Sequence, residues 1–242
     1  MKIIKLNSTD STNSYLKRLI IQRTLKDFSV VVANNQTDGR GQRGSVWLSE
    51  QGKNLTFSVF KKKLNLDPSK QFILHILVSL SIVKALDSFN VPRLSIKWPN
   101  DILSGNFKIS GVLIENLIKQ NQIEHSIIGI GLNVNQLKFE GLTKVSSLKK
   151  IIPLAVDKDK LLVKIIDKLK IYFKLYAQNG SEFFTSEYES YLFLKDKLSI
   201  FSSPQNSLFT GIIRGVSASG KLCIEMEGFD REFDLKEIKF VY

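Results

Sequence analysis

Two apolar runs constrain most strongly what this chain can fold into. Residues 111–115 (GVLIE) and 126–133 (SIIGIGLN) are near-continuous segments of Ile, Val and Leu. Such runs are typical of central strands buried on both faces of a sheet, whereas a half-exposed strand alternates apolar and polar residues. The sequence therefore predicts a sheet with other elements packed against both of its faces.

The other segments add strands and helices without strict alternation of the two. Shorter strands are expected at residues 3–6, 29–33, 55–60 and 94–98, and helices at residues 11–20, 68–90, 159–177 and 182–192. Asp67 followed by Pro68 predicts a helix start, and Asn179 followed by Gly180 predicts a helix end. We expect a fold of the α+β class (mixed α/β), in which helices flank a mixed sheet.

The texture of the sequence changes at about Lys197. Four short strand signals follow, separated by turn signals, at residues 198–201, 208–216, 222–227 and 232–238. A segment of this size is near the lower limit for folding alone, so we expect it to pack on the larger part. The sequence therefore predicts two domains, residues 1–193 and residues 194–242.

Charge is the unusual feature of the composition. Lys and Arg number 35 and Asp and Glu 23, which gives a formal net charge of +12 and favours a polyanionic partner. A single cysteine excludes an internal disulfide, and two histidines leave too few ligands for a structural zinc site. The N-terminus has no signal-peptide pattern, and the longest uncharged stretch, residues 71–83, is too short to span a bilayer. We expect a cytoplasmic protein without a membrane partner.

The densest candidate site runs from Gln36 to Trp47 (QTDGRGQRGSVW). It contains G-x-G-x-x-G, but a strand rather than a helix is expected after it, which argues against a dinucleotide-binding turn. Glycines that expose backbone N–H groups, together with two arginines, suit an anion, and the Trp47 indole suits stacking on a base. A basic surface loop is the alternative interpretation.

Three further clusters lie at strands. Lys97-Trp98-Pro99-Asn100-Asp101 (KWPND) and Gly129–Asn133 (GIGLN) lie at strand ends, where a capped turn is the alternative to a binding site. Lys108 precedes an apolar strand, where an ammonium group is costly to desolvate unless it meets an anion. Gly111 would let a ligand approach the backbone, and an Asn133 amide could pair with adenine.

The order and spacing of these segments resemble those of the biotin–protein ligase family. The matching segments are DSTN at 10–13, Gln36 with GRGQRGSVW, KWPND at 97–101, KISGVLIE at 108–115 and GIGLN at 129–133. The resemblance implies a catalytic domain similar to class II aminoacyl-tRNA synthetases, followed by a small SH3-like β-barrel. It also indicates the monofunctional class, because no DNA-binding segment precedes the first strand, so we expect no DNA partner.

The resemblance implies a two-step reaction. The biotin carboxylate attacks the α-phosphorus of ATP, pyrophosphate leaves, and biotinyl-5′-AMP then passes its biotin to a lysine of a biotin carboxyl carrier protein. Positioning and charge stabilisation would carry this chemistry, with Mg²⁺ travelling on ATP. The chain would act as a monomer or a homodimer.

The resemblance also implies roles for individual residues. Lys108, Arg40 and Lys97 are the expected catalytic cations. The implied biotin-binding residues are Ser11, Thr12, Asn13, Gln36, Gly39, Arg40, Gly41, Gln42, Lys108 and Gly111. The implied ATP- or adenylate-binding residues are Arg40, Gln42, Arg43, Trp47, Lys97, Asn100, Lys108 and Asn133. No dedicated metal site is expected, although Asp101 could lie near the Mg²⁺. Gln42 replaces an arginine common in the family, which removes a charge and a forked donor.

Two alternatives stay open. A lipoate or octanoate ligase would share the fold and a lysine such as Lys108, although the GRGQRG…W and KWPND patterns favour biotin. A basic nucleic-acid-binding protein would need basic residues gathered with aromatics on one face. Here the lysines are spread over nearly every segment.

Overall fold

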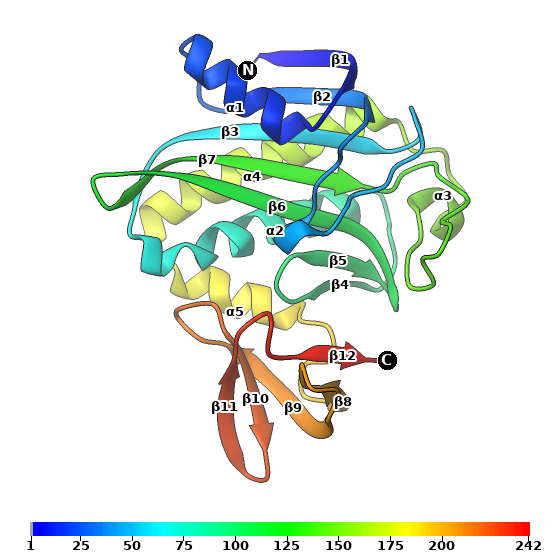
Figure 1. Ribbon diagram of the computed structural model, residues 1–242, viewed down its shortest axis with the longest axis vertical. Coiled ribbons are helices and arrows are strands. Elements are labelled where there is room, and N and C mark those ends of the chain that lie inside the picture. The colour runs from blue at the N-terminus through cyan, green and yellow to red at the C-terminus, as the bar shows by residue number, and fades with distance from the viewer. Residues whose placement is uncertain (1) are drawn as a thin grey trace.

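The computed structural model describes residues 2–242, except for the side chain of Arg43, and shows a large sheet with helices beside a smaller β-module (Figure 1). The large sheet has seven strands in the order β1-β2-β3-β7-β6-β5-β4. Their bounds are β1 Ile3–Thr9, β2 Ser29–Gln36, β3 Leu55–Leu66, β4 Leu94–Lys97, β5 Asp101–Ser104, β6 Phe107–Lys119 and β7 Gln122–Leu132. β1 and β2 are parallel and all other neighbours are antiparallel. The two apolar runs are the inner strands β6 and β7, as predicted.

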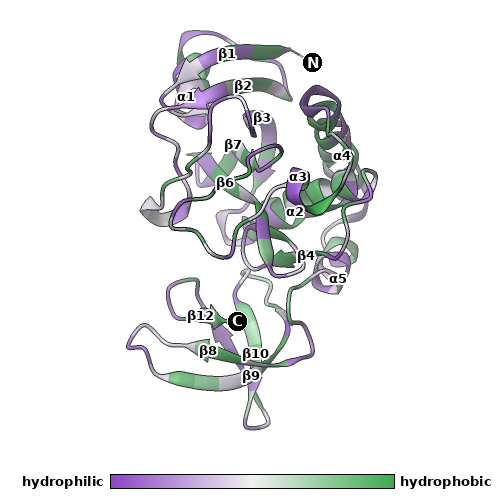
Figure 2. Cartoon of the chain, turned by 90° about the vertical axis from the view of Figure 1, so that its right-hand side faces the viewer, coloured by the Kyte–Doolittle hydropathy of each residue, from purple (hydrophilic) through white to green (hydrophobic). Residues whose placement is uncertain are grey.

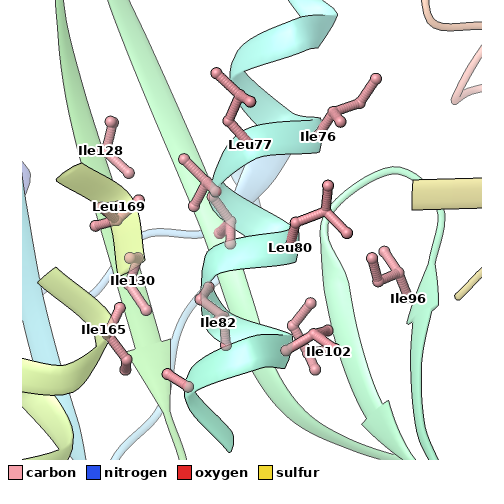
Figure 3. Close-up of a cluster of buried hydrophobic side chains, with 14 of the residues drawn as sticks. Ile76, Leu77, Leu80, Ile82, Ile96, Ile102, Ile128, Ile130, Ile165 and Leu169 are labelled. Atoms are coloured by element: carbon pink, nitrogen blue, oxygen red, sulfur yellow. The ribbon is translucent and has the colours of Figure 1, made fainter. Parts of the chain in front are cut away.

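Helices cover both faces of this sheet. Consecutive residues of a strand point to opposite faces, and the consecutive pairs Val30–Val31 and Ile127–Ile128 are each divided between two apolar clusters. One cluster contains α1 (Thr12–Gln22), and the other contains α2 (Phe72–Asp87) and α4 (Lys158–Asn179). Figure 3 shows side chains of α2 between those of α4 and the strands. The predicted α+β class with a mixed, helix-flanked sheet is confirmed.

The helix α2 is the centre of the larger core. With the short helix η2 (Pro68–Lys70) before it, this segment is long and apolar enough to cross a membrane by length and composition. Of its most apolar window, however, 72% is buried inside the fold. Nearly all of its side chains, from Phe72 to Leu86, meet other core residues. Core packing therefore accounts for its apolar character.

The β-module is a separate antiparallel sheet in the order β11-β10-β9-β8-β12. Its strands are β8 Leu198–Ser202, β9 Leu208–Val216, β10 Leu222–Met226, β11 Phe229–Phe233 and β12 Lys239–Val241. The expected strand at 232–238 was wrong, because a turn divides it. In that turn the Glu237 N–H donates to the Asp234 carbonyl at 2.9 Å, while the Glu237 carboxylate accepts from the Asp234 N–H at 2.7 Å.

Three short helical segments complete the chain: η1 Gln42–Gly44, α3 Leu148–Ile151 and α5 Glu182–Ser190. The helix α5 precedes the β-module, which lies at one end of the molecule next to β4 and α5 (Figure 2). Two hydrogen bonds are among the contacts that join the module to the larger part. Trp98 Nε1 donates to the Gly220 carbonyl at 2.9 Å, and Val216 N donates to Glu189 Oε1 at 2.9 Å. Gly220 has no room for a Cβ because Phe72 fills that space. The module is therefore seated closely on the larger part, and the boundary at 193/194 stays a prediction.

Candidate active site

One cavity of about 280 Å³ brings together segments that are far apart in the sequence. It lies where the start of α1, the loop after β2 and the strands β5, β6 and β7 meet. Its lining residues are Ser11, Thr12, Asn13, Gln36, Arg40, Gly41, Gln42, Ser45, Val46, Trp47, Thr56, Asn100, Asp101, Lys108, Gly111, Val112, Leu113, Gly129, Ile130, Gly131 and Leu235. The strand β6 carries three parts of the site in order: a polar network near Glu115, a glycine floor at Gly111 and a cationic end at Lys108.

The polar network begins at the start of α1. Gln36 Oε1 accepts from Thr12 N at 2.8 Å and from Thr12 Oγ1 at 3.1 Å, which leaves the Gln36 NH₂ group to donate to a ligand. Ser58 Oγ lies 2.7 Å from Thr12 Oγ1 and 2.6 Å from Asn13 Oδ1. Thr12, Asn13 and Ser58 are all buried. Buried polar groups satisfied in this way hold a single arrangement, so this end of the cavity is preorganised.

Glu115 connects this network to the loop after β2. Its Oε2 accepts from Asn13 Nδ2 at 2.7 Å and lies 3.7 Å from the Arg40 guanidinium. Arg40 Nη2 also donates to Ser14 Oγ at 2.6 Å. The Arg40 side chain is 43% exposed, so a ligand can compete for it. Glu115 was not predicted as a site residue, although it closes the KISGVLIE segment.

The floor of the cavity is made by two glycines opposite each other on β6 and β7, Gly111 and Gly131. The Trp47 indole lies on them: a Cβ on Gly131 would be 2.5 Å from Trp47 Cζ2, and a Cβ on Gly111 would be 3.3 Å from Cζ3. Trp47 Nε1 is buried and meets no hydrogen-bond partner in residues 2–242. Because neither glycine has a side chain, the two strands leave a slot that accepts a planar ring, and the Trp47 indole fills it in this structure.

The cationic end contains one ion pair. Lys108 Nζ lies 2.7 Å from Asp101 Oδ1, with both side chains partly exposed. Asn100 is fixed to β6 by two hydrogen bonds to Val112. Its side-chain Nδ2 donates to the Val112 carbonyl at 2.8 Å, and its backbone carbonyl accepts from Val112 N at 3.0 Å. Asp101 is the first residue of β5 and Asn100 lies in the turn before it, whereas Lys108 lies on β6. The four-residue strand β5 was not predicted from the sequence.

Most predicted site residues line this cavity. They are Ser11, Thr12, Asn13, Gln36, Arg40, Gly41, Gln42, Trp47, Asn100, Asp101, Lys108 and Gly111. The side chain of Arg43 lies outside the described residues. Leu235 of the β-module also reaches the cavity, which no sequence signal indicated.

Three predicted residues do not line the cavity. Gly39 instead joins the two ends of the loop, because its backbone carbonyl accepts from Trp47 N at 2.9 Å. Asn133 is buried, and its Nδ2 donates to the Ser146 carbonyl at 3.0 Å. Lys97 points to the β-module, with its Nζ 4.9 Å from the centre of the Tyr242 ring. Burial lowers the pKa of Lys97; Asp101 opposes this shift and Lys108 adds to it.

Comparison with known proteins bears on this site directly. The sequence model of the biotin/lipoate A/B protein ligase family matches residues 6–133, which is more than half of the chain. The chain belongs to this family. The match spans α1, the loop after β2 and the strands β3 to β7, and so contains nearly the whole lining of the cavity.

Known proteins extend the similarity over nearly the whole chain. The bifunctional ligase/repressor BirA of Escherichia coli is 28% identical over 227 residues, covering 90% of this chain and 68% of that protein. Biotin–[acetyl-CoA-carboxylase] ligase of Mycobacterium tuberculosis is 24% identical over 223 residues, covering 91% and 82%. The structure of biotin protein ligase from Aquifex aeolicus with biotin and ATP superposes with a TM-score of 0.80 at 28% identity, covering 98% and 97%. The predicted fold and the predicted family are confirmed.

Proposed function

We propose that this chain is an ATP-dependent biotin–protein ligase that forms AMP. The observation that carries the proposal is the cavity itself, because it joins a preorganised hydrogen-bonding end to a cationic end along β6. A related enzyme of 28% identity, similar over nearly its whole length, was solved with biotin and ATP bound. Biotin has the matching chemistry, with a polar ureido ring at one end and a carboxylate at the other.

The polar network would hold the ureido ring. Gln36 can donate its amide N–H, and Thr12 and Ser11 supply buried hydroxyl groups beside it. Asn13 supports them through Ser58 and Glu115. The aliphatic tail would then run over the glycine floor, which requires the Trp47 indole to leave the slot or to move over the tail.

Lys108 would meet the biotin carboxylate at the cationic end. It lies on the same strand as the glycine floor, and its Nζ is 5.8 Å from the centre of the Trp47 ring. In the first step a carboxylate oxygen attacks the α-phosphorus of ATP and the bond to the bridging oxygen of pyrophosphate breaks. Two anions must approach each other, and Lys108, Lys97 and Arg40 would offset their repulsion. Arg40 would exchange Glu115 for the ligand.

The adenylate would be held by the loop after β2. Gly41, Gln42 and Trp47 line the cavity from this loop, and Asn100 faces them from the turn before β5. Closure of the loop would exclude water from the mixed anhydride. In the second step a lysine amine of the acceptor attacks the acyl carbon, AMP leaves, and the amine loses a proton.

Mg²⁺ would enter with ATP rather than occupy a site built by the protein. Asp101 is the carboxylate at the cationic end, and it is already paired with Lys108. Residues 2–242 contain no group of three or more His, Cys, Asp or Glu side chains placed to hold a metal ion. The phosphate oxygens of ATP are the natural ligands for this hard cation.

The acceptor would be a lysine of a biotin carboxyl carrier protein, because related ligases are named for acetyl-CoA carboxylase. We place the reaction in the cytoplasm, where ATP and that carboxylase meet. Lipoate ligation is the second activity that the family description contains. Two relatives similar over nearly the whole chain are named as biotin ligases, one from Mycobacterium tuberculosis and one from Aquifex aeolicus.

Pyrophosphate exchange into ATP tests this function. We expect exchange that depends on biotin, at least tenfold below that rate with lipoate or octanoate, and transfer of biotin to a carrier domain. Lys108→Ala should abolish exchange, whereas Lys119→Ala at the far end of the same strand should not. Exchange with lipoate equal to that with biotin would overturn the proposal.

A further inference from the structure

The β-module contributes to the cationic end of the active site, and its contribution is aromatic. Leu235 lines the cavity, and Phe240 and Tyr242 lie just beyond it. Lys97 Nζ is 5.1 Å from the centre of the Phe240 ring and 4.9 Å from that of Tyr242, whose hydroxyl oxygen lies 3.4 Å away. The Tyr242 ring also packs against the Phe193 ring in an edge-on arrangement, with the two ring centres 4.8 Å apart.

A second lysine uses the same aromatic ring. Lys144 Nζ is 4.9 Å from the centre of the Tyr242 ring. The backbone places Lys144 next to the site, because its carbonyl accepts from Lys108 N at 2.8 Å. Tyr242 therefore lies against two ammonium groups, those of Lys97 and Lys144, and the backbone of Lys144 is hydrogen-bonded to that of Lys108.

These two lysines differ from Lys108 in how their charge is balanced. Lys108 is paired with Asp101 at 2.7 Å. For Lys97 and Lys144, no carboxylate oxygen among the described side chains lies within 4.0 Å of Nζ. Lys144 is exposed, so water also solvates its charge, whereas Lys97 is partly buried. A partly buried ammonium group without a counterion is costly unless another group stabilises it, and the face of an aromatic ring does so in part. Burial also lowers the pKa of Lys97, consistent with incomplete neutralisation.

We propose that Tyr242 is a positioning residue for polyphosphate binding, and that Lys144 is a second cation for the same ligand. The ring of Tyr242, with Phe240, keeps Lys97 and Lys144 beside the cationic end without a carboxylate partner, so that the β- and γ-phosphates of ATP complete their neutralisation. This inference rests on the proposed function for the identity of the ligand. It makes the β-module part of the nucleotide site, whereas the biotin end is built entirely by the larger part.

The distinguishing consequence is a separation of the two substrates. Loss of the Tyr242 ring should weaken the binding of ATP and pyrophosphate without changing the binding of biotin, because the end of the cavity at Thr12 and Gln36 does not contact the module. The hydroxyl contact at 3.4 Å is long, so the ring should matter more than the hydroxyl group.

Calorimetric titration of the full chain with MgATP, magnesium pyrophosphate and biotin tests the proposal. We expect Tyr242→Leu to raise the dissociation constants of ATP and pyrophosphate about 3- to 30-fold, the range of a partly desolvated cation–π contact. Tyr242→Phe should raise them less than about threefold, and all biotin values should stay within twofold. Lys144→Ala should weaken the binding of ATP, whereas Lys138→Ala, in the same loop, should leave it unchanged.

Three outcomes overturn the proposal: an unchanged ATP constant in Tyr242→Leu, an equal loss of biotin binding, or equal effects of Lys144→Ala and Lys138→Ala. If Tyr242→Leu does not fold, the Lys144 and Lys138 pair decides the matter. These titrations do not require turnover. A wild-type chain that binds ATP through Tyr242 and Lys144 but forms no biotinyl-5′-AMP would refute the proposed function and support this inference.

Discussion

The polar end of the cavity depends on a glycine, and Gly129→Ala tests how tightly that end is built. Gly129 lies on β7 between Ser58 of β3 and Leu113 of β6. The Asn13 amide packs on the space that a side chain would occupy. A Cβ at this position would be 2.5 Å from Asn13 Oδ1 and 3.0 Å from its Cγ. An ordinary carbon–oxygen contact is about 3.3 Å, so the amide would have to retreat by about 0.8 Å.

That retreat costs two hydrogen bonds, one buried and one partly buried. Asn13 Oδ1 lies 2.6 Å from Ser58 Oγ, and Asn13 Nδ2 lies 2.7 Å from the Glu115 carboxylate. The first is worth about 1 kcal/mol and the second, to a charged group, about 1.5–3 kcal/mol. Alanine returns about 0.4–1 kcal/mol by restricting the unfolded chain. We therefore expect Gly129→Ala to lower the free energy of unfolding by about 1.5–3.5 kcal/mol and to raise the KM for biotin.

Urea denaturation followed by circular dichroism measures this change, as a midpoint lowered by about 1 M. The decisive control is the Asn13→Ala background, which removes the amide that the new methyl group would meet. There Gly129→Ala should cost less than about 0.5 kcal/mol. If it costs the same in both backgrounds, the clash is not with Asn13 and the reasoning is refuted.

Two further predictions concern charge. Glu115→Gln keeps an acceptor for Asn13 but frees Arg40, so release of biotinyl-5′-AMP, followed by stopped-flow, should slow by up to about fivefold while the KM for biotin stays unchanged. Glu115→Ala removes the acceptor as well and should raise the KM for biotin in steady-state assays. If the two variants behave alike in both assays, Glu115 does not have these two roles. Burial lowers the pKa of His75 from 6.5 to about 4. As the pH falls, the unfolded chain therefore takes up a proton at this imidazole before the folded chain does, and the free energy of unfolding should fall by up to about 3 kcal/mol between pH 6.5 and 4. His75→Leu should flatten that slope in urea titrations repeated across this range, and an unchanged slope would exclude His75 as its cause.

Local patterns predicted the elements with strong periodicity and missed those set by pairing. The run GVLIE was expected as a short strand, but β6 extends from Phe107 to Lys119 because β5 and β7 pair along it. The strand β5 was missed because its four residues follow a turn and resemble a loop. The expected strand at 232–238 failed for the opposite reason, since alternating side chains do not reveal that Asp234 and Glu237 form a turn.

The site shows the same division. Motif residues such as Thr12, Gln36 and Lys108 were found because the spacing of the motifs is specific to the family. Ser58 and Glu115 were not found, because a serine and a glutamate in apolar strands carry no local signal. Their roles come from neighbours on other strands and on α1.

The sequence by itself determined the fold class, the family and most of the residues that line the cavity. These depend on local periodicity and on short motifs, which are properties of neighbouring residues. Only the tertiary structure decided that Trp47 lies in the glycine slot and that Lys97 faces Tyr242 of the β-module. The physical reason is that a side chain's partners are set by the packing of elements distant in the sequence, and no local pattern encodes that packing.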